Sequence, residues 1–251
     1  MKTLIVLGVA ASAALALPKN DAAPAPETGT ITGKVVWDGD MPKPLEPLQI
    51  KEQEAQGCDH GDAGMDNADR SLLIDKDSKG IANVVYFLEI DGVQMEVPEE
   101  PIVFDQKGCR FEPHVAVVPV GATLHYKNSD GTNHNVHTYS RKNDQINKNV
   151  AAGDALPQKL EKAETFEVKC DIHPWMKGYI IVSDASMAVV SGADGSFKLE
   201  GVPAGKYKLS YWHEKLGKGK TEEIEVKVGE TATFEQKLKE GKSGGGRRRR
   251  R

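Results

Sequence analysis

The chain of 251 residues is long enough for one large or two ordinary domains with hydrophobic cores. It carries 33 basic and 37 acidic residues, and without the five arginines at its end the net charge changes from −4 to −9. A folded body this acidic argues against nucleic-acid binding, because the phosphate backbone attracts basic surfaces.

The first residues, MKTLIVLGVAASAALAL, combine a basic start, an apolar run and small residues. This pattern predicts a secretory signal over residues 1–16, with Ala14-Leu15-Ala16 before the cleavage site. The apolar run is shorter than the roughly 20 residues of a membrane span, and no cysteine follows it to accept a lipid. We therefore expect an exported protein, periplasmic or secreted, without a transmembrane segment.

Residues 17–28 are rich in Pro and Ala and indicate a linker. Beyond it, short β-branched runs alternate with Gly, Asp and Pro, and no amphipathic helix of ordinary length stands out, so we expect an all-β protein. At the other end, SGGGRRRRR indicates a disordered basic tail over residues 241–251. The tail either contacts an anionic partner or stays solvated.

The segment GADGSFKLEGVPAGKYKLSYWHE, residues 192–214, resembles transthyretin-like sandwiches of the carboxypeptidase regulatory-like family. Asp194-Gly195 suits a hairpin that needs a positive φ, and Pro203 with Gly205 suits a tight reversal. The resemblance implies a small β-sandwich. Trp212 with its polar neighbours His213 and Glu214 is a candidate contact for a polysaccharide or a cell-envelope protein, and a core tryptophan beside a surface turn is the alternative that fits better.

The opening of that family pattern lies far upstream, in ITGKVVWDGD and IANVVYFLEI. We therefore predict a transthyretin-like sandwich split over residues 29–98 and 184–240. Residues 99–183 would be a second domain inserted into it, because the two ends of a sandwich can lie close together. Three consecutive domains are the alternative.

The chain has three cysteines, Cys58, Cys109 and Cys170. In an oxidising compartment structural cysteines pair. If Cys170 is a metal ligand, Cys58 and Cys109 remain as one disulfide. The alternative is that Cys170 takes part in a disulfide and another cysteine stays free, which is unusual in an exported protein.

Two short motifs, HNVH at 134–137 and CDIHPWM at 170–176, bring together a cysteine, histidines and a methionine. A thiolate, two imidazoles and a weak thioether are the ligands of a mononuclear copper site for electron transfer. Strand-like runs flank the second motif, so its three donors would lie on one loop at the end of a sandwich, with the fourth on a neighbouring strand.

The two motifs together resemble the cupredoxins, the blue copper proteins of the amicyanin and plastocyanin type, over about residues 102–183. The resemblance implies a Greek-key sandwich with one type 1 copper site. Carried over onto this chain, it makes His134, Cys170, His173 and Met176 the ligands. It makes Asn135 the residue whose hydrogen bonds tie the two ligand loops together.

In this family the second histidine usually lies near the surface among apolar residues through which electrons pass, so the resemblance implies an exit patch at Pro174 and Trp175. His137 is the alternative to His134 as the upstream ligand. Because the two lie three residues apart on an extended segment, they point to opposite faces, so at most one of them enters the site. His125 and His114 fit ordinary strand positions. His60 fits a solvated loop beside Cys58 better than a second metal site.

We expect an exported one-electron carrier that works with a redox partner protein and is not an enzyme. No base, nucleophile or carboxylate pair is arranged for turnover, and a fully ligated copper has no open position for substrate. The alternatives are a cell-envelope binding module on a cupredoxin-like scaffold, and a copper storage or delivery protein.

Overall fold

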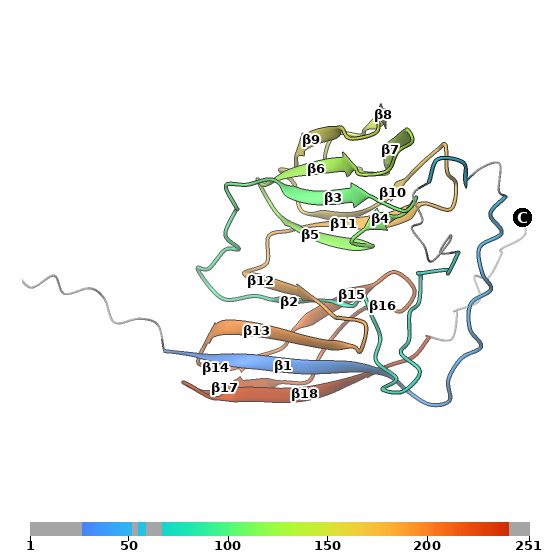
Figure 1. Ribbon diagram of the computed structural model, residues 1–251. Helices are drawn as coiled ribbons and strands as arrows, with labels where there is room; N and C mark the ends of the chain where they lie inside the picture. The colour runs from blue at the N-terminus through green and yellow to red at the C-terminus, as the bar shows by residue number, and fades with distance from the viewer. Residues whose placement is uncertain (1–26, 52–54, 59–66, 241–251) are drawn as a thin grey trace, which may run out of the picture.

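The computed structural model describes residues 27–51, 55–58 and 67–240, which form 18 β-strands and no α-helix (Figure 1). The all-β prediction is therefore confirmed. The predicted signal, all but the end of the linker and the basic tail lie outside the described residues. No helix in the described part of the chain is long and apolar enough to cross a membrane.

Nine consecutive strands form a first sandwich of two sheets. One sheet has the order β4-β3-β6-β9 and the other the order β5-β11-β10-β7-β8. The strands are β3 (Ile102–Gln106), β4 (Phe111–Glu112), β5 (Val115–Pro119), β6 (Thr123–Asn128), β7 (His134–Thr138), β8 (Asn147–Val150), β9 (Ala155–Lys159), β10 (Glu164–Lys169) and β11 (Lys177–Ser183).

The core of the first sandwich fills the space between these two sheets and reaches the candidate ligands. It contains stacked Phe104 and Phe111 rings with centroids 5.1 Å apart, and it extends to Cys170 and Met176 at one end. A Cβ on Gly178 would lie 2.8 Å from the Phe104 ring, so only glycine lets β11 approach the core this closely.

A second sandwich is built from strands that come before and after the first sandwich in the sequence. Its sheets have the orders β13-β1-β18, β12-β2-β15-β16 and β14-β17. The strands are β1 (Thr28–Trp37), β2 (Val85–Leu88), β12 (Met187–Val190), β13 (Ser196–Pro203), β14 (Gly205–Tyr207), β15 (Ser210–His213), β16 (Gly217–Lys220), β17 (Ile224–Val226) and β18 (Thr231–Leu238).

The pairing of β1 with β13 and β18, and of β2 with β12 and β15, joins segments that residues 102–183 separate along the chain. Alternating burial along β1 places Ile31 and Val35 in the core of this second sandwich. Gly195 has a φ of 79°, as the predicted Asp194-Gly195 turn requires. The transthyretin-like identity of this sandwich and its division from the first stay predictions.

The two sandwiches stack, with the sheet that contains β5 and β11 facing the sheet that contains β2, β12 and β15 (Figure 1). Val115 and Ile181 of the first sandwich pack against Val85 and Trp212 of the second. The segment that follows β1 leaves the second sandwich and runs along one side of the first. There, Cys58 forms a disulfide with Cys109, which confirms the predicted pairing.

Candidate metal centre

The strand pairing explains how two distant motifs meet. Strands β10 and β11 pair as far as Lys169 and Lys177, so residues 170–176 form the loop that closes their hairpin. Strand β7 pairs antiparallel with β10, with His137 opposite Lys169. His134, at the start of β7, therefore extends beyond the end of β10 and lies beside the loop.

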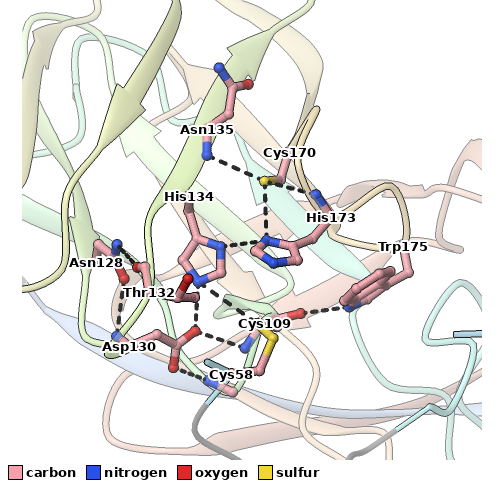
Figure 2. Close-up of a disulfide and its surroundings, with 11 residues drawn as sticks. Cys58, Cys109, Asn128, Asp130, Thr132, His134, Asn135, Cys170, His173 and Trp175 are labelled. Carbon is pink, nitrogen blue, oxygen red and sulfur yellow. Dashed lines mark hydrogen bonds and ion pairs between the residues drawn. A yellow bond between two sulfur atoms is a disulfide. The ribbon is translucent and has the colours of Figure 1, made fainter. Parts of the chain in front are cut away.

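Three of the predicted donors converge at this place (Figure 2). His134 Nδ1 lies 2.9 Å from His173 Nδ1, and Cys170 Sγ lies 3.7 Å from His173 Nδ1. The donor atoms of the three residues all lie within 4.8 Å of one another. All three residues are buried: His134 is 0% exposed, Cys170 1% and His173 3%. Met176, at the end of the loop, is fully buried.

Backbone hydrogen bonds hold the sulfur and shape the loop. Cys170 Sγ accepts the amides of Asn135 at 3.3 Å and His173 at 3.4 Å. The Met176 amide donates to the His173 carbonyl at 2.9 Å, and the Cys170 amide donates to the Met176 carbonyl. The Asn135 side chain accepts the Asp171 amide at 3.4 Å. Asn135 thus contacts the loop through both its backbone and its side chain.

These contacts favour the thiolate form of Cys170. Burial by itself raises the pKa of the thiol, but hydrogen bonds from His134, His173 and two backbone amides outweigh it and lower the pKa to about 6. A thiolate is the form that binds metals, so the site favours the ligand form of the residue near neutral pH.

Asp130 is a buried carboxylate of the site that the sequence analysis missed. Its Oδ2 lies 2.7 Å from His134 Nε2, and its two oxygens accept the amides of Gly108 at 2.6 Å and Cys109 at 2.8 Å. Burial raises the pKa of Asp130, but these hydrogen bonds outweigh it and lower the pKa. The only signal in the sequence was an aspartate in the turn four residues before His134.

The Asp130 contact assigns the two nitrogens of the His134 ring. Burial lowers the pKa of His134, but its hydrogen bonds with Asp130 and Cys170 outweigh this and raise it. A carboxylate at Nε2 keeps the proton on that nitrogen and leaves the Nδ1 lone pair for a metal. The carboxylate also fixes the orientation of the ring.

The disulfide lies against both imidazoles. Cys109 Sγ is 3.9 Å from His134 Nε2, and the two sulfurs lie within 4.8 Å of a ring nitrogen of His173. Trp175 donates from its indole N–H to the Cys109 carbonyl at 3.2 Å, and its ring centroid lies 5.2 Å from that of His173. His173 is therefore covered, whereas the family resemblance implied a histidine near the surface.

The remaining predicted positions are distinct from this cluster. Pro174 is exposed and Trp175 half-buried, so the predicted exit patch lies next to His173 on the outer side of the loop. His137 Nδ1 lies 3.0 Å from the Asp171 carboxylate, outside the group of donors. His125 is half-buried on β6, and His60 lies outside the described residues.

A soft sulfur and two imidazole nitrogens within 4.8 Å fit a copper ion, which prefers these donors, and the buried Met176 thioether lies on the same loop. The two other donor groups found in the described residues, Cys58-Cys109-His173 and Cys109-Asp130-His134, share residues with this one. The ligand assignment as a whole stays a prediction.

Residues 101–183 match the family of copper binding proteins of the plastocyanin/azurin type. A search of curated protein sequences finds no match.

Solved structures similar to part of the chain include a copper-containing nitrite reductase, amicyanin and a purple cupredoxin. The copper-containing nitrite reductase of Thermus scotoductus SA-01 is 23% identical over 39% of this chain and 25% of its own, with a TM-score of 0.33. A reduced mutant of amicyanin is 24% identical over 39% of this chain and 98% of its own, with a TM-score of 0.32. A purple cupredoxin from Nitrosopumilus maritimus is 27% identical over 29% of this chain and 81% of its own, with a TM-score of 0.26.

This chain spans only a quarter of the nitrite reductase. The family match covers the first sandwich and both motifs, so residues 101–183 are similar to copper binding proteins of the plastocyanin/azurin family.

Proposed function

We propose that this protein is an exported one-electron carrier with one type 1 copper ion bound by His134, Cys170, His173 and Met176. The observation that carries the proposal is the convergence of His134 Nδ1, His173 Nδ1 and Cys170 Sγ in a buried cluster. Copper, when bound, would supply the one-electron redox chemistry. The match of residues 101–183 to copper binding proteins supports this assignment.

The protein's own residues would prepare the site for fast electron transfer. Asp130 holds the His134 ring with Nδ1 directed at His173 and Cys170. The amides of Asn135 and His173 point at Cys170 Sγ and stabilise the thiolate. Because these partners are fixed by backbone hydrogen bonds, the donors would move little when the charge of the ion changes. Little rearrangement favours rapid electron transfer.

Electrons would leave through the Trp175 side of the loop. The Trp175 ring contacts His173 from one side and reaches the half-exposed surface beside Pro174. We therefore infer that a redox partner protein docks there. With four ligands assigned and all of them buried, the site leaves no open position for a substrate, which favours a carrier over an enzyme.

The test is the visible absorption spectrum of the exported chain loaded with Cu(II). We expect an intense thiolate-to-copper band that is lost in Cys170→Ser and in His134→Ala. His137→Ala is the matched control, because it removes an imidazole from the same strand outside the donor group, and should keep the band. A protein without the band would not be a blue copper carrier. That result would favour a cell-envelope binding module on a cupredoxin-like scaffold.

The burial of all four assigned ligands also favours a second candidate, copper storage or delivery. A storage protein would release Cu(I) readily to a chelator and give no reversible redox wave. A carrier would hold the ion and give a reversible wave in voltammetry. The same protein sample therefore separates the two functions.

A further inference from the structure

The metal centre has no exposed ligand in this fold. His134, Cys170, His173 and Met176 are each at most 3% exposed, and the disulfide and Trp175 lie against the two imidazoles. The disulfide, Trp175 and the segment that carries Cys58 together form a cover over the donors. An ion could reach the buried donors only if part of this cover opened. The cover itself is therefore the place to look for the route of entry.

The part of the cover that a single covalent bond holds in place is the segment that carries Cys58. Cys58 is half-buried, whereas its partner Cys109 is fully buried. Gly57 packs so closely on the loop before His134 that an added Cβ would lie 2.9 Å from Thr132. Residues 55–58 contain no strand, and the disulfide ties them to Cys109, beside the metal centre.

The two sulfurs of the Cys58–Cys109 disulfide lie where they could themselves bind a metal. Cys58 Sγ, Cys109 Sγ and a ring nitrogen of His173 lie within 4.8 Å of one another. Cys109 Sγ also lies 3.9 Å from His134 Nε2. Two thiolates and an imidazole form a soft donor set that suits Cu(I). As a disulfide the sulfurs are poor ligands, so the set becomes complete only on reduction.

We propose that reduction of the Cys58–Cys109 disulfide creates an entry site for Cu(I), formed by the two thiolates and His173. This deepens the proposed function, because His173 would be common to the entry site and to the copper site within. Reduction would free residues 55–58 from Cys109, and so open the cover, in the same step that supplies the two sulfur ligands.

The chemistry requires an external dithiol, either a small molecule or a reducing protein. One of its thiolates attacks Cys58 Sγ, the more accessible sulfur, and Cys109 leaves as a thiolate. The second thiol of the reductant then displaces Cys58 and closes its own disulfide. Two electrons pass to the protein, which gains two thiols. Binding of Cu(I) by both sulfurs releases their two protons.

The test uses Cys170→Ser, which removes the thiolate of the inner site and keeps all three residues of the entry site. The protein is reduced with dithiothreitol, desalted without oxygen and titrated with Cu(I) against bicinchoninate, a coloured Cu(I) chelator. We expect the reduced protein to withdraw one equivalent of Cu(I) from the chelator. The same variant with its disulfide intact should withdraw none, and Cys58→Ser added to Cys170→Ser should abolish binding.

The role of His173 has its own control. His173→Ala in the Cys170→Ser background should weaken Cu(I) binding by at least the roughly 10–100-fold that loss of a residue supporting a metal ligand costs. His137→Ala in the same background should leave the affinity unchanged. An unchanged Cu(I) affinity in His173→Ala would overturn the proposed entry site, and so would a reduced protein that takes up no Cu(I).

A second measurement tests entry. Reduced wild-type protein should take up Cu(I) faster than the disulfide form at equal concentration, and faster than Cys58→Ser, which also lacks the disulfide but has lost one sulfur of the entry site. Equal rates for the two forms would overturn the role of the disulfide as a cover. The blue band of the disulfide form tests the proposed function separately, because Cys170→Ser removes the band but keeps Cys58, Cys109 and His173.

Discussion

The protein buries histidines in two clusters whose surroundings differ. At the loop end of the first sandwich, His134 and His173 direct a ring nitrogen at each other and at a thiol. At the contact between the sandwiches, His114 Nε2 lies 2.5 Å from Glu214 Oε1, and His213 Nδ1 accepts the amides of Lys215 and Leu216. The second cluster will be called the interface cluster.

The difference shows why buried histidines alone do not make a metal site. In the interface cluster Glu214 is also bonded by Lys177 at 2.7 Å, so its charge is matched by a fixed cation. The ring nitrogens His114 Nε2 and His213 Nδ1 are used in holding the structure together. At the candidate metal centre Asp130 contacts only Nε2 of His134 and leaves Nδ1 directed at Cys170 and His173. The two clusters therefore differ in the direction of the lone pairs on their histidine ring nitrogens.

The largest expected effect on stability is at the interface cluster. Glu214→Gln should destabilise the protein by about 3 kcal/mol, because it leaves the half-buried Lys177 ammonium without its counter-charge and weakens the buried contact with His114. The measurement is urea denaturation at neutral pH. Glu223→Gln is the matched control, since its pair with Lys206 is exposed and should change the free energy of unfolding by less than about 1 kcal/mol. Equal effects of the two variants would show that the cluster does not join the sandwiches.

The interface cluster also predicts a pH dependence. Burial lowers the pKa of His213 from 6.5 to about 4, while the nearby Glu214 raises it and His114 lowers it. The unfolded chain therefore takes up this proton at higher pH than the folded protein does. Stability due to neutral His213 is complete above pH 6.5 and is lost as the pH falls toward 4.

This loss should be on the order of 3 kcal/mol over that range. His213→Asn keeps an acceptor for the two backbone amides but cannot titrate, so its stability should fall less between pH 6.5 and 4. The check is urea denaturation of both proteins across this range. Parallel curves would contradict the assignment.

At the metal centre, Asp130→Asn tests whether the carboxylate orients His134. We expect copper affinity to fall by about 10–100-fold, the usual cost of removing a group that orients a metal ligand. The measurement is competition with a copper chelator. Asp171→Asn removes an exposed carboxylate that contacts His137 instead, and should leave the affinity unchanged.

The smallest effect is expected for His137→Ala. His137 and Asp171 form a pair whose side chains are 29% and 48% exposed, so its removal should cost less than about 1 kcal/mol of stability. The copper affinity should not change. A large loss of copper in this variant would mean that His137, rather than His134, is the ligand from β7.

Much of the candidate site could be predicted from short patterns. The order of donors in HNVH and CDIHPWM was enough to propose four ligands, and three of them converge in the structure. The cysteine count led to the Cys58–Cys109 pair. Asp130 could not be predicted, because an aspartate in a turn usually faces solvent. Its role depends on the buried amides of Gly108 and Cys109, which come from another loop.

The sequence by itself determined the all-β class and the donor types, because alternation and motif spacing are local properties of the chain. It predicted the Cys58–Cys109 disulfide only on the condition that Cys170 binds a metal. Tertiary structure alone decided that the disulfide and Trp175 cover His173, and that Glu214 pairs with His114 and Lys177. Except for the contact between Trp175 and His173, these contacts join residues 37 to 115 positions apart. Such contacts form only when two sandwiches and the segment beside them pack together, and no short pattern in the sequence encodes that packing.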